Sequence, residues 1–216
     1  MRIMFRVSLN MIVRSCFSCP DVLPIGVLNL TSMESGISCG PVAQADPQED
    51  QRSCLVFIGM PGSGKSTLGK WVCVEKNCAW VDTDYLMQAW WAMPLQSILG
   101  HLGLESFMEA EAEIVKALSL RQTVISTGGS VVYRPDAMKH LSALGRVIYL
   151  RTDLQTILKR IQDAGSRGVV MQKGYNLEQV YAQRLPLYEK YAEFILDTDE
   201  TTVQECLEAI NAWLAK

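Results

Sequence analysis

The stretch Gly59-Met60-Pro61-Gly62-Ser63-Gly64-Lys65-Ser66-Thr67 decides the fold of this chain. Its first eight residues fit the pattern G-x-x-x-x-G-K-[ST], an apolar run over 54–58 leads into it, and a helical pattern over 67–74 follows. Glycines let the backbone bend so that several N–H groups point at one spot, and the following helix adds its positive N-terminal end. The sequence therefore predicts a phosphate-binding loop between a strand and a helix.

Each residue of this loop has an expected task around a nucleoside triphosphate. Lys65 is expected to reach the β- and γ-phosphates, and the Ser66 hydroxyl is expected to ligate Mg²⁺. The other loop residues expected to bind ATP are Gly59, Pro61, Gly62, Ser63, Gly64 and Thr67. The alternative interpretation is an ordinary glycine-rich turn.

Length and composition restrict the class of protein. The chain has 216 residues, of which 49% are hydrophobic, and this suits one domain with a full core and some excess at one end. The net charge is −3 and no Lys/Arg run stands out, so we expect no nucleic-acid partner. No run reaches 18 apolar residues, so we expect no membrane span. Seven scattered cysteines fit a reducing compartment, so we expect a cytoplasmic protein. We also expect it to be a monomer that acts on a small molecule.

The first quarter of the chain differs from the rest. Residues 1–52 lack a sustained helical or strand period, and 36–52 reads as a polar linker. The first twenty residues contain three arginines and no acid, which resembles a targeting segment, but Met33 is equally suited to be a later translation start. We expect residues 1–52 to be a disordered extension or linker, and residues 53–216 to form the folded domain.

From residue 53 onward, apolar strand patterns alternate with helical patterns. The expected strands are 55–58, 79–81, 123–126, 146–150 and 194–196. The expected helices are 65–75, 85–117 with breaks near Pro94 and Gly103, 135–144, 153–162, 177–192 and 202–214, and a glycine-rich flexible segment is expected over 164–174. This alternation predicts an α/β fold with a parallel sheet covered by helices on both faces.

Three polar signals follow the ends of expected strands: the loop, Asp82 with Asp84, and Gly128-Gly129. Ligands of such sheets bind beyond the carboxyl ends of the strands, so we expect one common site. We also expect the strand before the two acids to lie beside the strand before the loop. One of the two carboxylates can then face a metal ion and the other a substrate hydroxyl. The alternative is a helix N-cap at Thr83 or Asp84 with Asp82 solvated.

From about residue 54 to residue 216 the chain resembles the shikimate kinase family. The motifs that carry the resemblance are, in chain order, the loop with Thr67-Leu68-Gly69, then Asp82-Thr83-Asp84, Ile125-Ser126-Thr127-Gly128-Gly129, the spacing of Arg160 and Arg167, and Arg184 before Leu187-Tyr188-Glu189. The resemblance implies a P-loop NTPase-type three-layer α/β/α fold with a five-stranded parallel sheet. It also implies a kinase that transfers the γ-phosphoryl group of MgATP to a hydroxyl of a small polar metabolite.

The resemblance further implies roles for single residues. Asp82 is expected to help hold Mg²⁺, Asp84 to bind the substrate hydroxyls and act in catalysis with Lys65, and Gly128 and Gly129 to contact the substrate.

Three arginines complete the implied site. Arg160 is expected against adenine, Arg167 on a closing lid where it reaches the phosphates during catalysis, and Arg184 on the substrate carboxylate, a task that suits a bidentate guanidinium. The alternatives are that Arg160 merely solvates a helix face and that Arg184 pairs with a neighbouring acid.

The chain departs from the family pattern at three places. The family usually has Phe-Arg-x-x-Glu in the substrate-binding region, whereas this chain has Phe107-Met108-Glu109-Ala110-Glu111, so Met108 replaces an arginine. Ser130 stands where the family has a third glycine, and Gly168-Val169 follows Arg167 where the family has Pro-Leu. We therefore expect an intact ATP-binding half and an altered substrate-binding half that includes Met108, Glu111 and Ser130.

The loss of the arginine leaves Glu111 without its implied cation. A partly buried carboxylate without a partner is costly, so another positive charge is expected there. A substrate ammonium is one candidate, which suggests a hydroxy amino acid such as homoserine. The competing interpretation is that Lys116 or Arg134 replaces the arginine and shikimate remains the substrate. Two further rivals are a nucleotide-binding module without turnover and a nucleoside monophosphate kinase.

Overall fold

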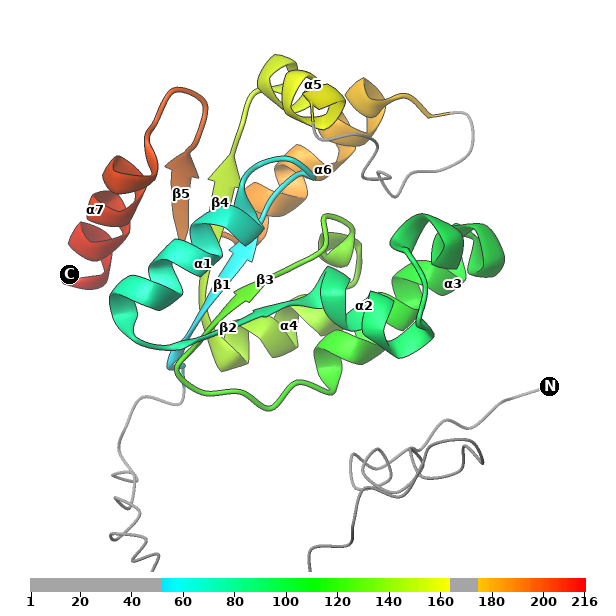
Figure 1. Ribbon diagram of the computed structural model, residues 1–216, viewed down its shortest axis with the longest axis horizontal. Helices are drawn as coiled ribbons and strands as arrows, with labels where there is room; N and C mark the ends of the chain where they lie inside the picture. The colour runs from blue at the N-terminus through cyan, green and yellow to red at the C-terminus, as the bar shows by residue number, and fades with distance from the viewer. Residues whose placement is uncertain (1–51, 164–174) are drawn as a thin grey trace, which may run out of the picture. The chain divides into compact units, whose positions relative to one another are not determined.

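The computed structural model describes residues 52–163 and 175–216 (Figure 1). The strands are β1 (Cys54–Ile58), β2 (Ala79–Asp82), β3 (Thr123–Ser126), β4 (Gly145–Arg151) and β5 (Phe194–Asp197). The helices are α1 (Lys65–Lys76), α2 (Thr83–Trp91), α3 (Leu95–Lys116), the 3₁₀ turn η3 (Val131–Tyr133), α4 (Pro135–Leu144), α5 (Leu154–Asp163), α6 (Leu177–Tyr191) and α7 (Val203–Leu214). The expectations for residues 1–51 and for the lid with Arg167 lie outside the described residues.

The five strands form one parallel sheet in the order β2-β3-β1-β4-β5. The expected α/β fold with a five-stranded parallel sheet is confirmed. The expectation that the acid-bearing strand lies next to β1 is wrong, because β3 pairs with both β1 and β2 and separates them. Burial gives the reason: every residue of β3 is buried, whereas β2 begins with an exposed residue and is buried only at its end, as suits the edge of the sheet.

Alternate strand residues point to opposite faces and build two cores. On β1, Val56 and Ile58 pack with α3, α4 and α6, whereas Phe57 packs with α1 and α7. The same alternation recurs on β4, where Tyr149 belongs to the first core and Ile148 to the second. Figure 1 shows helices on both sides of the sheet, so the molecule has the expected three α/β/α layers.

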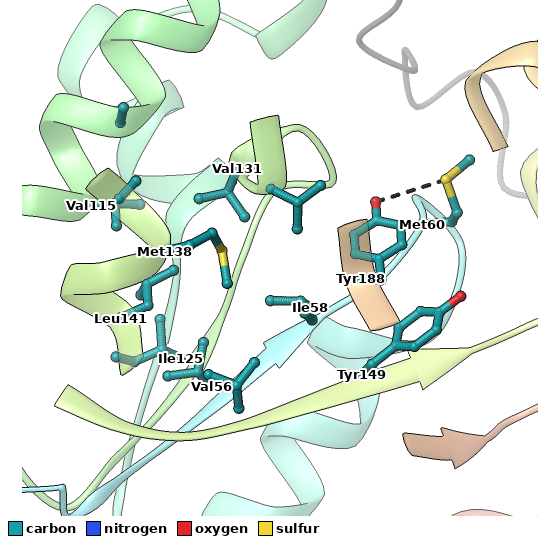
Figure 2. Close-up of a cluster of buried hydrophobic side chains, with 14 of the residues drawn as sticks. Val56, Ile58, Met60, Val115, Ile125, Val131, Met138, Leu141, Tyr149 and Tyr188 are labelled. Carbon is teal, nitrogen blue, oxygen red and sulfur yellow. Dashed lines mark hydrogen bonds between the residues drawn. The ribbon is translucent and has the colours of Figure 1, made fainter. Parts of the chain in front are cut away.

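The first core reaches the carboxyl end of the sheet through two tyrosines. Tyr149 of β4 and Tyr188 of α6 are stacked, with ring centroids 5.0 Å apart, and both are buried (Figure 2). The Tyr188 hydroxyl lies 3.8 Å from the sulfur of Met60 in the loop and donates a 2.7 Å hydrogen bond to the carbonyl of Gly129. The core thus fixes the loop and the double-glycine turn relative to each other.

A third, smaller apolar cluster lies apart from the sheet. Met87 of α2 packs with Ile98 and Phe107 of α3, and all three side chains are buried. The expected breaks are confirmed: Pro94 precedes the first turn of α3, and Gly103 interrupts this helix with a φ of 73°. This cluster holds α2 and the two arms of α3 together beyond the strand ends, where α2 carries Asp84 and α3 carries Glu111.

Arg52, which was expected to end the N-terminal segment, is bonded to the folded part of the chain. Its guanidinium donates to the carbonyls of Ser142 at 2.8 Å and Gly145 at 3.0 Å, and it pairs with Glu193. None of the helices in the described ranges is long and apolar enough to cross a membrane. The monomeric state and the cytoplasmic location stay predictions.

Candidate active site

The loop after β1 has the backbone shape that its glycines predict. Gly59, Gly62 and Gly64 have φ values of 145°, 82° and 94°, which side chains rarely tolerate. A side-chain carbon at Gly59 would also lie 2.7 Å from the carbonyl oxygen of Leu150. Helix α1 begins directly after Gly64, so its free N–H groups and its positive end face the space above the loop.

Lys65 is folded back over this loop. Its ammonium donates to the carbonyls of Gly59 at 2.9 Å and Met60 at 2.8 Å, and the residue is only 7% exposed. Burial lowers the pKa of Lys65 to about 8, although the nearby carboxylates of Asp84 and Asp82 oppose this shift. A bound triphosphate would supply negative charge where the ammonium now has mainly carbonyl partners, so the charged form of Lys65 would then be favoured.

Ser66 at the start of α1 and Asp82 at the end of β2 meet although β3 separates β1 from β2. The Ser66 hydroxyl donates a 2.6 Å hydrogen bond to Asp82, whose other carboxylate oxygen accepts from the backbone N–H of Asp84 at 3.0 Å. Asp82 is therefore itself the N-cap of α2 and is 7% exposed, whereas the alternative interpretation placed the cap at Thr83 or Asp84 and left Asp82 solvated.

The pair of oxygens from Ser66 and Asp82 fits Mg²⁺. A hydroxyl and a carboxylate are hard oxygen ligands, and protein-bound Mg²⁺ commonly takes one or two such groups together with phosphate oxygens and water. Among the residues that the structure describes, no group of three or more His, Cys, Asp or Glu side chains is arranged to hold a metal ion. A magnesium ion at Ser66 and Asp82 would therefore depend on a bound triphosphate and water for its remaining ligands.

A cavity of about 710 Å³ opens above the loop. The expected site residues that line it are Pro61, Gly62, Ser63, Gly64, Lys65, Ser66, Thr67, Asp82, Asp84, Glu111, Gly129, Ser130, Arg160 and Arg184. Three expected residues, Gly59, Met108 and Gly128, do not line it. Most of the residues singled out from the sequence thus surround one cavity, as the rule for the carboxyl ends of parallel strands predicts.

Arg160 lies at one end of this cavity. Its guanidinium donates to the carbonyl of Thr198 at 2.6 Å and points a second nitrogen at the carbonyl of Gly62, 3.4 Å away. It therefore bridges the loop and the connection after β5, instead of merely solvating a helix face. Thr201, Val203 and Cys206 continue the wall of the cavity from there.

Glu111 and Ser130 lie at the other end of the cavity and are 2% and 1% exposed. The Ser130 hydroxyl donates a 2.6 Å hydrogen bond to Glu111. Burial, and then the charge of Asp84, raise the pKa of Glu111 to about 7, while the bond from Ser130 acts in the opposite direction. With this pKa, the carboxyl group of Glu111 changes between its charged and uncharged forms near neutral pH.

Arg184 stands beside the double-glycine turn and is 1% exposed. Its Nε donates to the hydroxyl of Tyr133 at 3.3 Å, its guanidinium lies 5.2 Å from the centre of that ring, and a side-chain carbon on Gly129 would come within 3.0 Å of it. Sequence reasoning missed Tyr133, because a single tyrosine in a short 3₁₀ turn has no pattern that marks it. Tyr188 was noted only as part of a motif, and its hydrogen bond to the carbonyl of Gly129 was not predicted.

The two basic residues considered as replacements for the missing arginine lie elsewhere. Lys116 pairs with Asp136 at 2.9 Å, and Arg134 pairs with Glu105 at 2.6 Å. Neither lines the cavity. In the part of the chain that the structure describes, Arg184 is thus the only arginine that lines the end of the cavity beside Glu111.

Comparisons with known proteins agree on one family. The family profile described as shikimate kinase matches residues 61–215. A shikimate kinase of Cupriavidus pinatubonensis is 32% identical over 161 residues, which cover 73% of this chain and 83% of the relative. One of Thermodesulfovibrio yellowstonii is 31% identical over 159 residues, which cover 72% of this chain and 91% of the relative.

Solved structures agree with the fold. Shikimate kinase from Acinetobacter baumannii in complex with shikimate superposes with a TM-score of 0.69 at 22% identity, over 77% of this chain and 94% of that one. Shikimate kinase from Aquifex aeolicus superposes with a TM-score of 0.62 at 24% identity, over 75% of this chain and 96% of that one. From the profile and the relatives together, this chain belongs to the shikimate kinase family and is a small-molecule kinase that uses ATP and Mg²⁺ to phosphorylate a hydroxyl group.

Proposed function

We propose that this kinase phosphorylates the hydroxyl group of a small hydroxy amino acid such as homoserine. One observation carries the proposal: among the described residues around the acceptor end of the cavity, a single arginine, Arg184, accompanies two carboxylates, Asp84 and Glu111. Such a balance of charge suits a zwitterion, whose carboxylate can bind the guanidinium and whose ammonium can bind an acid. Membership of the shikimate kinase family argues against the two rival interpretations, a module without turnover and a nucleoside monophosphate kinase.

In the proposed reaction the loop and Lys65 hold the β- and γ-phosphates, and Ser66 and Asp82 would hold Mg²⁺. Mg²⁺ held there would supply positive charge that offsets the charge of the phosphate oxygens. Asp84 orients the acceptor hydroxyl and accepts its proton as the oxygen–phosphorus bond forms. The bond between the γ-phosphorus and the bridging oxygen breaks, and ADP leaves with that electron pair. Closure of Arg167 over the phosphates remains a proposal for a residue outside the described ranges.

Shikimate is the second candidate acceptor. The curated relatives are shikimate kinases, and one similar structure is a complex with shikimate. Met108 does not line the cavity, and Lys116 and Arg134 are paired with acids elsewhere. Among the described residues, Arg184 would therefore have to hold the shikimate carboxylate without a second arginine beside it.

Steady-state kinetics with both acceptors at saturating MgATP test the proposal. We expect kcat/KM for homoserine to exceed that for shikimate by about tenfold or more, because a site built around an ammonium leaves its acids unpaired when the ammonium is missing. A higher kcat/KM for shikimate would overturn the proposed acceptor and leave the kinase assignment intact.

A further inference from the structure

We propose that Thr198 is a positioning residue for nucleotide binding, because it holds two successive peptide groups of the phosphate-binding loop. Its hydroxyl acts on one of them directly, and its carbonyl acts on the other through Arg160. Thr198 directly follows β5 and lines the cavity, yet it is only 7% exposed. The inference goes beyond the proposed acceptor, since it concerns the phosphate end of the cavity and requires only that the chain binds MgATP.

A pair of buried threonine hydroxyls lies where β4 and β5 end. Oγ1 of Thr152 and Oγ1 of Thr198 are 2.6 Å apart, and Thr152 is 1% exposed. A buried hydroxyl needs an acceptor for its proton, and in the described part of the chain Thr198 is the acceptor within reach of Thr152. Thr152 therefore donates to Thr198, which leaves the proton of the Thr198 hydroxyl for another partner.

The proton of the Thr198 hydroxyl has two carbonyl acceptors. Oγ1 lies 3.1 Å from the carbonyl oxygen of Arg151 and 3.3 Å from that of Ser63. The carbonyl of Arg151 already accepts the backbone N–H of Thr198 at 2.9 Å. Ser63 is 0% exposed, and its carbonyl accepts from no other donor among the described residues. Because a buried carbonyl without a donor is costly, the hydroxyl of Thr198 stabilises this conformation of the loop.

The direction of the Ser63 carbonyl decides where the next N–H of the loop points. No peptide bond of the described residues is cis. In a trans peptide the C=O and the N–H lie in one plane and point in opposite directions, so a bond that holds the carbonyl of Ser63 also fixes the N–H of Gly64. Gly64 lines the cavity directly before α1. Glycines on both sides of Ser63 leave the loop flexible in sequence terms, and the bond from Thr198 restricts this freedom.

The carbonyl of Thr198 acts on the preceding peptide group. It accepts a 2.6 Å hydrogen bond from the guanidinium of Arg160, whose other terminal nitrogen points at the carbonyl of Gly62, 3.4 Å away. The donors of a guanidinium lie in a fixed plane, so the bond to Thr198 sets the direction of the second nitrogen. Thr198 thus holds two consecutive carbonyls of the loop, and a triphosphate meets N–H groups that are already oriented, which lowers the cost of binding.

Calorimetry with MgATP tests this inference without any acceptor, so the result does not depend on whether homoserine or shikimate is the substrate. Thr198→Val keeps the branched shape and removes the hydroxyl, and we expect the dissociation constant for MgATP to rise by about tenfold. Thr198→Ser retains the hydroxyl and should stay within about threefold of the wild type. Magnesium tripolyphosphate, which contains no base, should lose affinity by the same factor as MgATP, because the hydroxyl acts on the loop.

The matched control is Thr123→Val, which removes another buried threonine hydroxyl with a carbonyl acceptor. Thr123 is 4% exposed and donates to the carbonyl of Arg121 at 2.8 Å, at the amino end of β3 and off the cavity. We expect this variant to bind MgATP as the wild type does. Thr152→Val removes the other hydroxyl of the buried pair without changing the cavity lining, and it should raise the dissociation constant by about threefold.

Three results would overturn the inference. The first is a wild-type dissociation constant in Thr198→Val, the second is an equal loss of affinity in Thr198→Ser, and the third is an equal loss in Thr123→Val. If Thr198→Val does not fold, as thermal unfolding would show, Thr152→Val replaces it, and an unchanged dissociation constant in that variant overturns the inference. The KM for the acceptor should change by less than about twofold in each variant, and a larger change than in the KM for ATP would also contradict the role of Thr198.

Discussion

The two ends of the cavity are built in different ways. The phosphate end comes from one continuous stretch, residues 59–67, and depends on backbone geometry and on the start of α1. The acceptor end is assembled from side chains far apart in the sequence, on α2, on α3, after β3 and on α6: Asp84, Glu111, Ser130 and Arg184. A backbone-built site tolerates little change, whereas a side-chain-built site can change its ligand by substitutions at single positions. The phosphate end therefore follows its motif closely while the acceptor end departs from the family pattern.

The largest expected effect belongs to the phosphate end. Lys65→Ala removes the buried ammonium that we propose to face the transferring group, and we expect kcat to fall by about a thousandfold or more with every acceptor. The matched control is Lys70→Ala on the same helix, an exposed lysine that lies over the ring of Trp80 and not in the cavity. Near-wild-type turnover by Lys65→Ala would remove the catalytic assignment.

The next largest effect tests the acceptor end alone. Arg184→Lys keeps the positive charge but loses the planar pair of donors, and we expect kcat/KM for the acceptor to fall by about a hundredfold. The KM for ATP should change by less than about threefold, because Arg184 lies beside Gly129 and Tyr133. Equal losses of kcat/KM for ATP and for the acceptor would show that the two ends of the cavity do not act independently.

Gly128→Ala places a methyl group between Glu111 and Asp84. One of the carboxylates must then move, and we expect kcat/KM for the acceptor to fall by about tenfold to thirtyfold. Calorimetry should give an unchanged dissociation constant for MgATP. An acceptor kcat/KM equal to that of the wild type would indicate that the present positions of Glu111 and Asp84 take no part in binding.

The dependence of the acceptor KM on pH should show a smaller effect at the acceptor end of the cavity. Glu111 has a raised pKa of about 7, so it is protonated and uncharged below this pH and charged above it. If the charged form binds an ammonium, the KM for homoserine should rise by about fivefold as the pH falls from about 7 to about 6. Lys65, with a pKa of about 8, stays charged in this window, so the KM for ATP should stay nearly constant. A flat profile for homoserine, or an equally steep one in Glu111→Gln, would contradict the assignment.

The smallest kinetic effect is expected far from both ends. Arg52→Ala removes hydrogen bonds to the carbonyls of Ser142 and Gly145 and the pair with Glu193. We expect urea unfolding to show a loss of about 1 kcal/mol of stability, with kcat/KM unchanged for both substrates. An altered KM would show that the amino-terminal end of the central strands is coupled to the cavity.

Local patterns in the sequence predicted the elements well. The strand over 123–126 and the helix over 135–144 have the expected bounds, because an apolar run and a proline at the first helical turn mark them. The remaining expected elements that lie within the described residues differ from the observed ones by a few residues at most. The order of the strands was not predictable in the same way, since β3 pairs with β1 through contacts about seventy residues apart in the chain.

The same limit applies to the site. The loop could be located from spacing alone, because its function depends on consecutive backbone groups. The bond from Ser130 to Glu111, the position of the Arg184 guanidinium over the Tyr133 ring and the bond from Ser66 to Asp82 arise only when segments apart in the sequence meet. No local pattern marks such contacts, so the acceptor end needed the three-dimensional structure.

The most direct test of this contrast between the two ends is a competition for limiting MgATP between equal concentrations of homoserine and shikimate, followed by phosphorus NMR. The ratio of the two phosphorylated products equals the ratio of the two kcat/KM values and does not depend on enzyme concentration. We expect phosphohomoserine to predominate. A predominance of phosphoshikimate would contradict it.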